Sequence, residues 1–209
     1  MIIYTLLILT ILLLYPISRK AGYTDNGLKV KTNSKPHTII ISVLLTLVLG
    51  LRGLTVGIDT VNYYNSFMRY QTMSLSNALE GVSYEYGYRL FQYFVGIIFQ
   101  EYQFLLIIVA IFYISVVSFH IHKHSKNPTF SYVLFILYGF YTFAFSTTRQ
   151  TIAIAFIMIA YEFISRKQLH KFIIFNLLAA SFHVTSLVFI PSYWITKFKI
   201  NKFTIFFLT

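Results

Sequence analysis

Residues 103–121, QFLLIIVAIFYISVVSFHI, contain no Asp, Glu, Lys or Arg. About 20 apolar residues suffice for one helix to cross the hydrocarbon core of a bilayer. We expect this segment to span a membrane, and other apolar segments of the chain to do the same: 1–17, 38–51, 130–148, 150–164 and 171–195, with a last one beginning near 203. The sequence therefore predicts an all-α fold, a polytopic transmembrane helical bundle forming a single domain over residues 1–209.

The composition supports a membrane protein. The chain is 57% hydrophobic and 11% charged, whereas about a quarter of the residues in soluble domains are charged. It has no Cys, which excludes disulfide frameworks, Cys-based zinc sites and Cys nucleophiles. The N-terminal MIIYTLLILTILLLYPI has no basic residue ahead of its apolar core, so we interpret it as a first transmembrane helix and not a cleaved signal.

The distribution of basic residues predicts the orientation. Every Lys lies in segments 18–37, 122–129, 165–171 and 196–202, whereas Arg52, Arg69, Arg89 and Arg149 fall on the other side of the predicted spans. Because Lys and Arg collect in cytoplasmic loops, we expect the lysine-rich segments inside and the N-terminus outside. The cytoplasmic segments then account for the net charge of +11, and nothing remains to support nucleic-acid binding.

Two segments do not fit simple spans. As a single span, 171–195 would place Lys197, Lys199 and Lys202 outside; a helix broken or re-entrant near 179–186 keeps them inside, and we favour this second alternative. Residues 88–100, YRLFQYFVGIIFQ, are amphipathic, and we expect this helix to lie in the membrane interface.

An arginine and a glutamine interrupt the apolar stretch FSTTRQTIAIAF, residues 145–156. Ser and Thr at 146–148 are good N-cap residues for the helix that follows, and helix N-termini bind anions. Arg149 is therefore a candidate ligand of a phosphate or carboxylate, the alternative being an arginine that extends to the headgroups. Gln150 is interpreted as a hydrogen-bonding residue beside this site.

Four more residues on the predicted outer side are candidates. Arg52 ends the second span, where contact with headgroups is the alternative to binding a substrate. Asp59 either caps a helix starting at Thr60 or accepts a proton, and Glu85 has the spacing of an ordinary helical ion pair with Arg89. His183 alone among the histidines lies away from the predicted cytoplasmic segments. Its imidazole could transfer a proton or make a structural hydrogen bond. No metal-binding motif is present, so we expect neither metal nor cofactor.

Several stretches occur together in a recognisable order: RGLTVGIDTVNYYNSF, YEYGYRLFQYFV, FSTTRQTIAIAFIMIA, FISRKQLHKF and LLAASFHVTSLVFIPSYW. Over roughly residues 40–200 they resemble the EpsG family of exopolysaccharide and capsule proteins, which is similar to the Wzy O-antigen polymerases. The motif residues that match are Arg52, Gly57, Asp59, Thr60, Tyr63, Glu85, Gly87, Arg149, Gln150, Phe182 and His183. Family members generally continue for several more spans, and FTIFFLT begins an apolar run without a flank, so we expect an N-terminal portion.

The resemblance implies a multi-pass protein of the bacterial cytoplasmic (inner) membrane that polymerises oligosaccharide repeat units carried on undecaprenyl pyrophosphate. It implies that Arg52, Arg149, Gln150, Thr60 and Tyr63 bind the lipid-linked oligosaccharide, and that His183, Asp59 or Glu85 acts on the acceptor hydroxyl without a metal. Membrane lipids and other exopolysaccharide assembly proteins are the further partners expected. A membrane acyltransferase, a flippase and an accessory subunit of the same pathway remain alternatives.

Overall fold

A computed structural model describes residues 2–24, 27–32, 34–80 and 84–196. The chain is predominantly helical, as the sequence predicts. In chain order its elements are α1 (Ile2–Leu13), η1 (Tyr15–Ser18), β1 (Arg19–Thr24), β2 (Gly27–Thr32), α2 (Ser34–Gly50), α3 (Thr60–Thr72), α4 (Leu75–Glu80), α5 (Tyr86–Phe99), α6 (Tyr102–His124), α7 (Pro128–Leu137), α8 (Phe140–Ser146), α9 (Thr148–Ser165), α10 (Leu169–Phe182), η2 (Val184–Phe189) and α11 (Ser192–Ile195).

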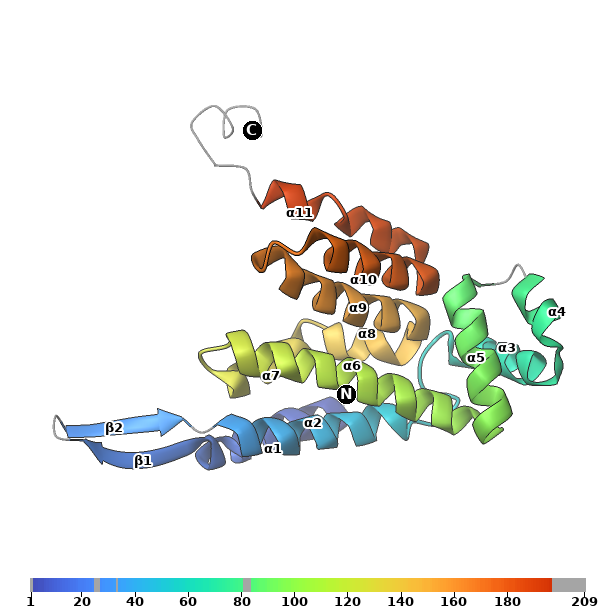
Figure 1. The fold of residues 1–209 in the computed structure, drawn as a ribbon. Helices are drawn as coiled ribbons and strands as arrows, with labels where there is room; N and C mark the ends of the chain where they lie inside the picture. The colour runs from blue at the N-terminus through green and yellow to red at the C-terminus, as the bar shows by residue number, and fades with distance from the viewer. Residues whose placement is uncertain (1, 25–26, 33, 81–83, 197–209) are drawn as a thin grey trace, which may run out of the picture.

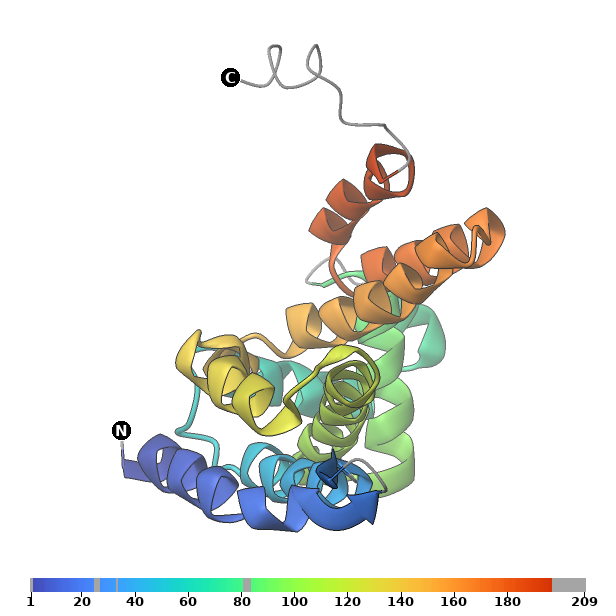
Figure 2. The ribbon, with the colours of Figure 1, turned by 90° about the vertical axis from the view of Figure 1, so that its left-hand side faces the viewer.

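The long helices are stacked side by side (Figure 1). Helix α6 packs between α2 and α9, and α10 covers α9. The view turned by 90° shows the same succession, from α1 and α2 up to α10 and α11 (Figure 2). Helices α3, α4 and α5 gather at one end of the stack and the β-hairpin lies at the other. The stack therefore has two distinct ends, and each of them carries a cluster of polar side chains.

Within the described residues, the one departure from an all-helical fold lies in the segment 18–37, which we expected to be a polar connection. Strands β1 and β2 pair antiparallel there, from Arg19 opposite Thr32 to Thr24 opposite Gly27. A polar segment between two helices must bond its own backbone groups to the chain or to water, and a hairpin does so locally. Elsewhere in the described chain the helical prediction is confirmed.

Within the described residues, α6 is the single unbroken helix whose length and apolar composition suit a membrane crossing. The pair α7 and α8 meets these criteria only as one bent span, with 49° between its halves. The bend occurs at Gly139, whose φ of +81° an L side chain rarely adopts. We had expected one uninterrupted span over 130–148. The multi-pass bundle thus remains a prediction, and the span expected from 203 lies outside the described residues.

The chain turns back on itself where we expected a broken helix. Helix α10 ends at Phe182, and His183 has an extended backbone with φ −156° and ψ 108°. The residues that follow return along α10, so that the rings of Tyr193 and Phe172 lie 5.2 Å apart. A hairpin, and not a single straight helix, therefore occupies residues 171–195.

The helix expected near 88–100 is α5, and it is amphipathic. Its buried face includes Tyr88, Gln92 and Val95, and Gln92 is bonded to Ser66 and to the carbonyl of Tyr63 on α3. Phe94, Ile97, Ile98 and Phe99 are exposed on its other face. Packing on α3 fixes the position of α5, whose N-terminal end contributes to the site described next.

Candidate functional site

Four of the predicted site residues meet at one end of the helix stack. Glu85 is the N-cap residue of α5, Arg149 and Gln150 lie in the first turn of α9, and His183 is the residue at which α10 ends. These segments are far apart in the sequence. The fold brings them together at the end where α5 meets α9 and α10 (Figure 1).

Glu85 is the centre of this cluster. Its Oε2 accepts a hydrogen bond from Arg149 Nη1 in an ion pair, and its Oε1 accepts one from the backbone N–H of Val184 at 3.2 Å. The same Oε1 lies 3.5 Å from Nδ1 of His183. Nε2 of Gln150 lies 3.1 Å from Nε2 of His183, so the amide donates to the ring. A neutral His183 then carries its proton on Nδ1, facing the carboxylate.

Gly87 allows the close approach that builds the cluster. A Cβ at this position would lie 2.4 Å from Oγ and 2.8 Å from the carbonyl oxygen of Ser181 on α10. Real side chains do not tolerate such contacts, and the carbonyl cannot rotate away as a flexible side chain would. The Glu-x-Gly pattern therefore has a structural reason, because the glycine lets the carboxylate two residues earlier reach the end of α10.

The electrostatics of the pair favour two charged groups. Burial acts to raise the pKa of the Glu85 carboxyl, but the backbone N–H groups of Glu85 and Val184 and the Arg149 guanidinium outweigh it, so the pKa lies below its ordinary value. Burial likewise acts to lower the pKa of Arg149, and Tyr63 and Glu85 reverse this to a net rise. Glu85 is therefore an anion at neutral pH.

Tyrosines line the cluster on the α3 side. Cζ of Arg149 lies 4.6 Å from the centre of the Tyr84 ring and 6.0 Å from that of Tyr63, distances suited to cation–π attraction. Tyr63 is 4% exposed, and burial raises the pKa of its hydroxyl despite the nearby Arg149. The side chains of Arg149, Glu85 and His183 are 23%, 20% and 19% exposed. The cluster is thus shielded but can still be reached.

Arg52 is buried and takes no part in the Glu85–Arg149 pair. Its Nη1 donates a hydrogen bond to the carbonyl of Leu49 at 2.9 Å, and its Cζ lies 5.6 Å from the centre of the Phe145 ring. Its Nε and Nη2 have no hydrogen-bond partner within the described chain. Burial lowers its pKa, while the hydroxyls of Tyr102, Tyr88 and Tyr141 act in the opposite direction. Arg52 thus retains unused hydrogen-bond donors.

Asp59 and Thr60 lie where α3 begins, Asp59 as its N-cap residue and Thr60 as its first helical residue. Thr60 is fully buried, and its hydroxyl donates to the carbonyls of Val56 and Phe145, which favours a structural role. Gly57, with φ +99°, would place a Cβ 2.0 Å from the same Phe145 carbonyl. Asp59 is the N-cap residue of α3 but makes no side-chain capping bond. It lies close enough to Tyr63 and Tyr84 to help raise the pKa of both hydroxyls.

The expected helical ion pair between Glu85 and Arg89 is wrong. Arg89 is 4% exposed and donates to the carbonyls of Ala78 and Leu79 at the end of α4. Its Cζ also lies 4.2 Å from the centre of the Tyr86 ring. Glu85 is the residue before the helix, so it is free to turn towards α9 and pair with Arg149.

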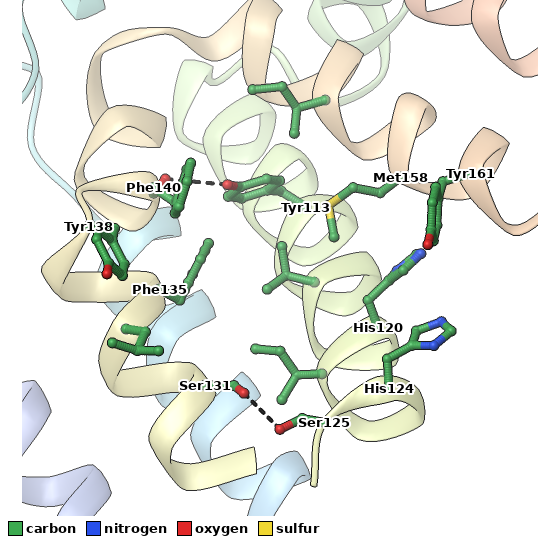
Figure 3. Close-up of a pocket in the computed structure, with 14 residues that line it drawn as sticks. Tyr113, His120, His124, Ser125, Ser131, Phe135, Tyr138, Phe140, Met158 and Tyr161 are labelled. Atoms are coloured by element: carbon green, nitrogen blue, oxygen red, sulfur yellow. Dashed lines mark hydrogen bonds between the residues drawn. The ribbon is translucent and has the colours of Figure 1, made fainter. Parts of the chain in front are cut away.

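Sequence reasoning missed a second cluster at the opposite end of α6 and α9. His120, His124 and Glu162 lie there with one ligand atom each, all within 4.8 Å of one another. The two histidines border an apolar cavity of about 700 Å³ between α6, α7 and α9 (Figure 3). Histidines four residues apart lie on one helix face, a signal that the sequence contains, but their carboxylate partner on α9 could not be read from spacing.

These features describe a predominantly helical protein with at least one apolar helix of membrane length and a partly buried polar cluster at one end of its helices. A sequence model of the EpsG family matches residues 37–209, and the chain belongs to the EpsG family. The predicted resemblance is confirmed. Membership indicates a membrane-associated protein of exopolysaccharide biosynthesis, a process that involves lipid-linked polysaccharide precursors. Searches of curated proteins and of solved structures found no match.

Proposed function

We propose that this protein polymerises oligosaccharide repeat units carried on undecaprenyl pyrophosphate, on the outer side of the bacterial membrane. The observation that carries the proposal is the assembly of Glu85, Arg149, Gln150 and His183 from three separate segments into one shielded cluster. Such an array offers both groups that glycosyl transfer from a pyrophosphate requires. One is a cation for the leaving group and the other is a base for the incoming hydroxyl.

The proposal includes a multi-pass arrangement with this cluster outside. Large apolar side chains such as Ile39, Ile111 and Leu177 are exposed on the stacked helices, as a lipid-facing surface requires. Polar groups are turned inward instead, as in the 2.7 Å hydrogen bond between Ser42 on α2 and Ser118 on α6. Interhelical hydrogen bonds of this kind are common between membrane helices. The described parts of three lysine-rich segments, 18–37, 122–129 and 165–171, lie at the end of the stack opposite to the cluster (Figure 1).

His183 is the base in this proposal and Glu85 positions it. An anionic Glu85 beside Nδ1 holds the ring in one tautomer and stabilises the imidazolium, as the carboxylate does in other nucleophile–base–carboxylate arrays. Nε2 then accepts the proton of the acceptor hydroxyl, which takes the place of the Gln150 amide. The hydroxyl oxygen forms a bond to the anomeric carbon, and the bond from that carbon to the pyrophosphate oxygen breaks.

Arg149 stabilises the departing pyrophosphate. Glu85 engages a single guanidinium nitrogen of Arg149, and a guanidinium carries five N–H donors. Arg149 also lies at the N-terminus of α9, where backbone N–H groups favour an anion. Arg52 supplies a second cation with unused donors. Asp59 is the competing candidate for the base, and variants distinguish it from His183.

The test is polymerisation of purified lipid-linked repeat units by the detergent-solubilised protein, with the glycan products separated by length. We expect Arg149→Ala to lower the rate about 100-fold or more, the cost of losing one stabiliser of developing charge. His183→Ala should lower it ~100- to 10,000-fold. Asp59→Asn should have a far smaller effect than His183→Ala. Arg52→Met should lower the rate while leaving the melting temperature unchanged or higher, because it removes a poorly bonded buried charge.

Two exposed residues provide matched controls. Arg69 is exposed on α3, and His170 is exposed on α10. Arg69→Ala and His170→Ala should keep the wild-type rate. If Arg149→Ala and His183→Ala polymerise at the wild-type rate, Arg149 does not stabilise the departing pyrophosphate and His183 is not the base.

Glycan analysis in a deletion strain separates this function from its rivals. Loss of a polymerase leaves single repeat units capped on the acceptor. Loss of an acyltransferase, for which His183 would also be a natural base, leaves long chains that lack the acyl group. Loss of a flippase leaves lipid-linked units on the cytoplasmic side, and loss of an accessory subunit is bypassed when the purified catalytic partner is supplied. Long chains of normal composition in the deletion strain would contradict a role as the polymerase.

A further inference from the structure

At the cytoplasmic end of the proposed topology, His120 and His124 project from the last turns of α6 towards Glu162 near the end of α9. Nε2 of His124 lies 2.7 Å from Oε1 of Glu162, and Nε2 of His120 lies 3.5 Å from the same oxygen. Glu162 is 6% exposed although it is a carboxylate. We propose that these three side chains bind one divalent transition-metal ion of the zinc type, which fastens α6 to α9.

The tautomer of His120 supports a metal ligand. Its Nδ1 lies 2.9 Å from the carbonyl oxygen of Val116, one helical turn earlier, and therefore donates its proton there. A neutral His120 then presents a lone pair on Nε2 to the carboxylate, and this buried atom has no hydrogen-bond partner in the described residues. Two acceptors that face each other repel unless a proton or a metal cation lies between them. Metal-bound histidines typically donate the other ring N–H to a backbone carbonyl in this way.

The carboxylate is arranged in the same manner. Its Oε1 faces the two imidazoles, whereas Oε2 accepts a hydrogen bond from the Lys123 ammonium. Ligating carboxylates are commonly held by such an outer hydrogen bond. The lysine also contributes a positive charge close to the ion, which lowers the affinity. Lys123 thus orients Glu162 and at the same time limits how tightly a cation is held.

The separations between the ligand atoms fit tetrahedral coordination of one ion. Zinc lies 2.0–2.2 Å from His nitrogen and carboxylate oxygen, so neighbouring ligand atoms are about 3.4 Å apart. The measured separations of 2.7 and 3.5 Å bracket this value. Two His and one Glu form a known zinc set that leaves a fourth position for water. Imidazole and carboxylate ligands favour such a first-row ion over calcium or magnesium.

An ion can reach the cluster. His124 is 49% exposed, and it borders the apolar cavity together with His120 (Figure 3). His120 and Glu162 also border a second cavity of about 270 Å³. The site lies at the opposite end of α6 from Arg149 and Glu85. An ion bound there would join two helices whose other ends hold the proposed reaction site.

The experiment measures zinc binding to the full chain in detergent, purified with a tag that contains no histidine and stripped with a chelator. Zinc is titrated in competition with a chromophoric chelator, and bound metal is counted by mass spectrometry. We expect about one zinc per chain and a rise in melting temperature upon binding, because a ligand of the native state alone stabilises it. His120→Ala and His124→Ala should each weaken binding ~100-fold or more, beyond the effect of losing an outer-shell group.

Two further variants sharpen the assignment. His122 lies on another face of α6 and borders a cavity with α2, so His122→Ala should bind zinc like the wild type. Lys123→Gln retains a donor to Glu162 and removes the charge, so its affinity for zinc should rise. The proposal is overturned if wild-type protein takes up no zinc, or if the double variant of His120 and His124 takes up as much. Zinc binding is read directly, so either result is independent of polymerase activity.

Discussion

At the scale of single residues, Glu85 determines the arrangement of the proposed reaction site. One carboxylate oxygen holds Arg149, and the other accepts the Val184 N–H and faces His183. Without this anion the partly buried guanidinium would lose its counter-charge, and the imidazole would lose the carboxylate that orients it. Leaving a charge unpaired in a shielded position is costly, so Glu85 contributes both to stability and to the proposed chemistry.

The lowered pKa of Glu85 predicts how stability changes with pH. The folded protein binds this proton less tightly than the unfolded chain does, so the stabilisation is complete above the ordinary value of 4.5 and is lost as pH falls through the folded-state pKa. Glu85→Gln should therefore melt at a lower temperature than wild type at neutral pH, and the difference should shrink on acidification below about pH 4.5. Melting curves in detergent between neutral and acidic pH provide the measurement.

The matched control is Glu101→Gln, since Glu101 is an exposed carboxylate that makes no capping bond. Its melting temperature should follow that of wild type at every pH. A constant difference between Glu85→Gln and wild type down to strong acid would show that the Glu85 charge does not stabilise the fold.

At the scale of elements, the decisive contact is the approach of the start of α5 to the end of α10. We expect Gly87→Ala to force these elements apart, because its Cβ would meet the backbone oxygen of Ser181 at 2.8 Å. Overpacking of this kind costs about 1–3 kcal/mol. Glu85 would move away from Val184 and His183, so the polymerisation rate should fall together with the melting temperature.

Gly53→Ala is the comparison for this prediction, because an added Cβ there meets nothing within 4 Å. It should keep both the rate and the melting temperature of the wild type. If Gly87→Ala behaves in the same way, the close packing of α5 on α10 is not what positions Glu85.

At the scale of the whole molecule, the two polar clusters lie at opposite ends of α6 and α9. The proposed topology places the cluster of Glu85 and Arg149 outside and that of His120 and Glu162 inside. The chain contains no Cys, so single cysteines can be introduced without a background. Asn65 and Lys126 are both exposed, on α3 and after α6 respectively.

Asn65→Cys should react with a membrane-impermeant maleimide in intact cells, because it lies on the side that holds the four arginines. Lys126→Cys should react only after the membrane is permeabilised, since it lies in a lysine-rich segment that the positive-inside rule places in the cytoplasm. Labelling is read on the purified protein by mass. The reverse pattern would invert the proposed topology and place Arg149 and His183 inside.

The identity of the helical segments follows from local sequence. Apolar runs, capping residues and breaks act over a few residues, and α6, α9 and the break at His183 all occur where these signals predict them. The β-hairpin and the bend at Gly139 were not predicted. Strands pair through backbone groups, and the amino-acid composition of a segment does not reveal which backbone groups bond to each other. A single glycine permits a bend in a helix but does not require one.

Sequence alone determined that this chain is apolar and helical, and it named Arg149, Glu85 and His183 as candidate site residues; the division of its charges between two sides of a membrane is its prediction. Only the tertiary structure decided which groups are partners. Local spacing favoured Arg89 for Glu85, but the fold joins Glu85 to Arg149 across 64 residues and to Val184 across 99. Such contacts depend on how helices pack, and helix packing is set by side chains distributed over the whole chain.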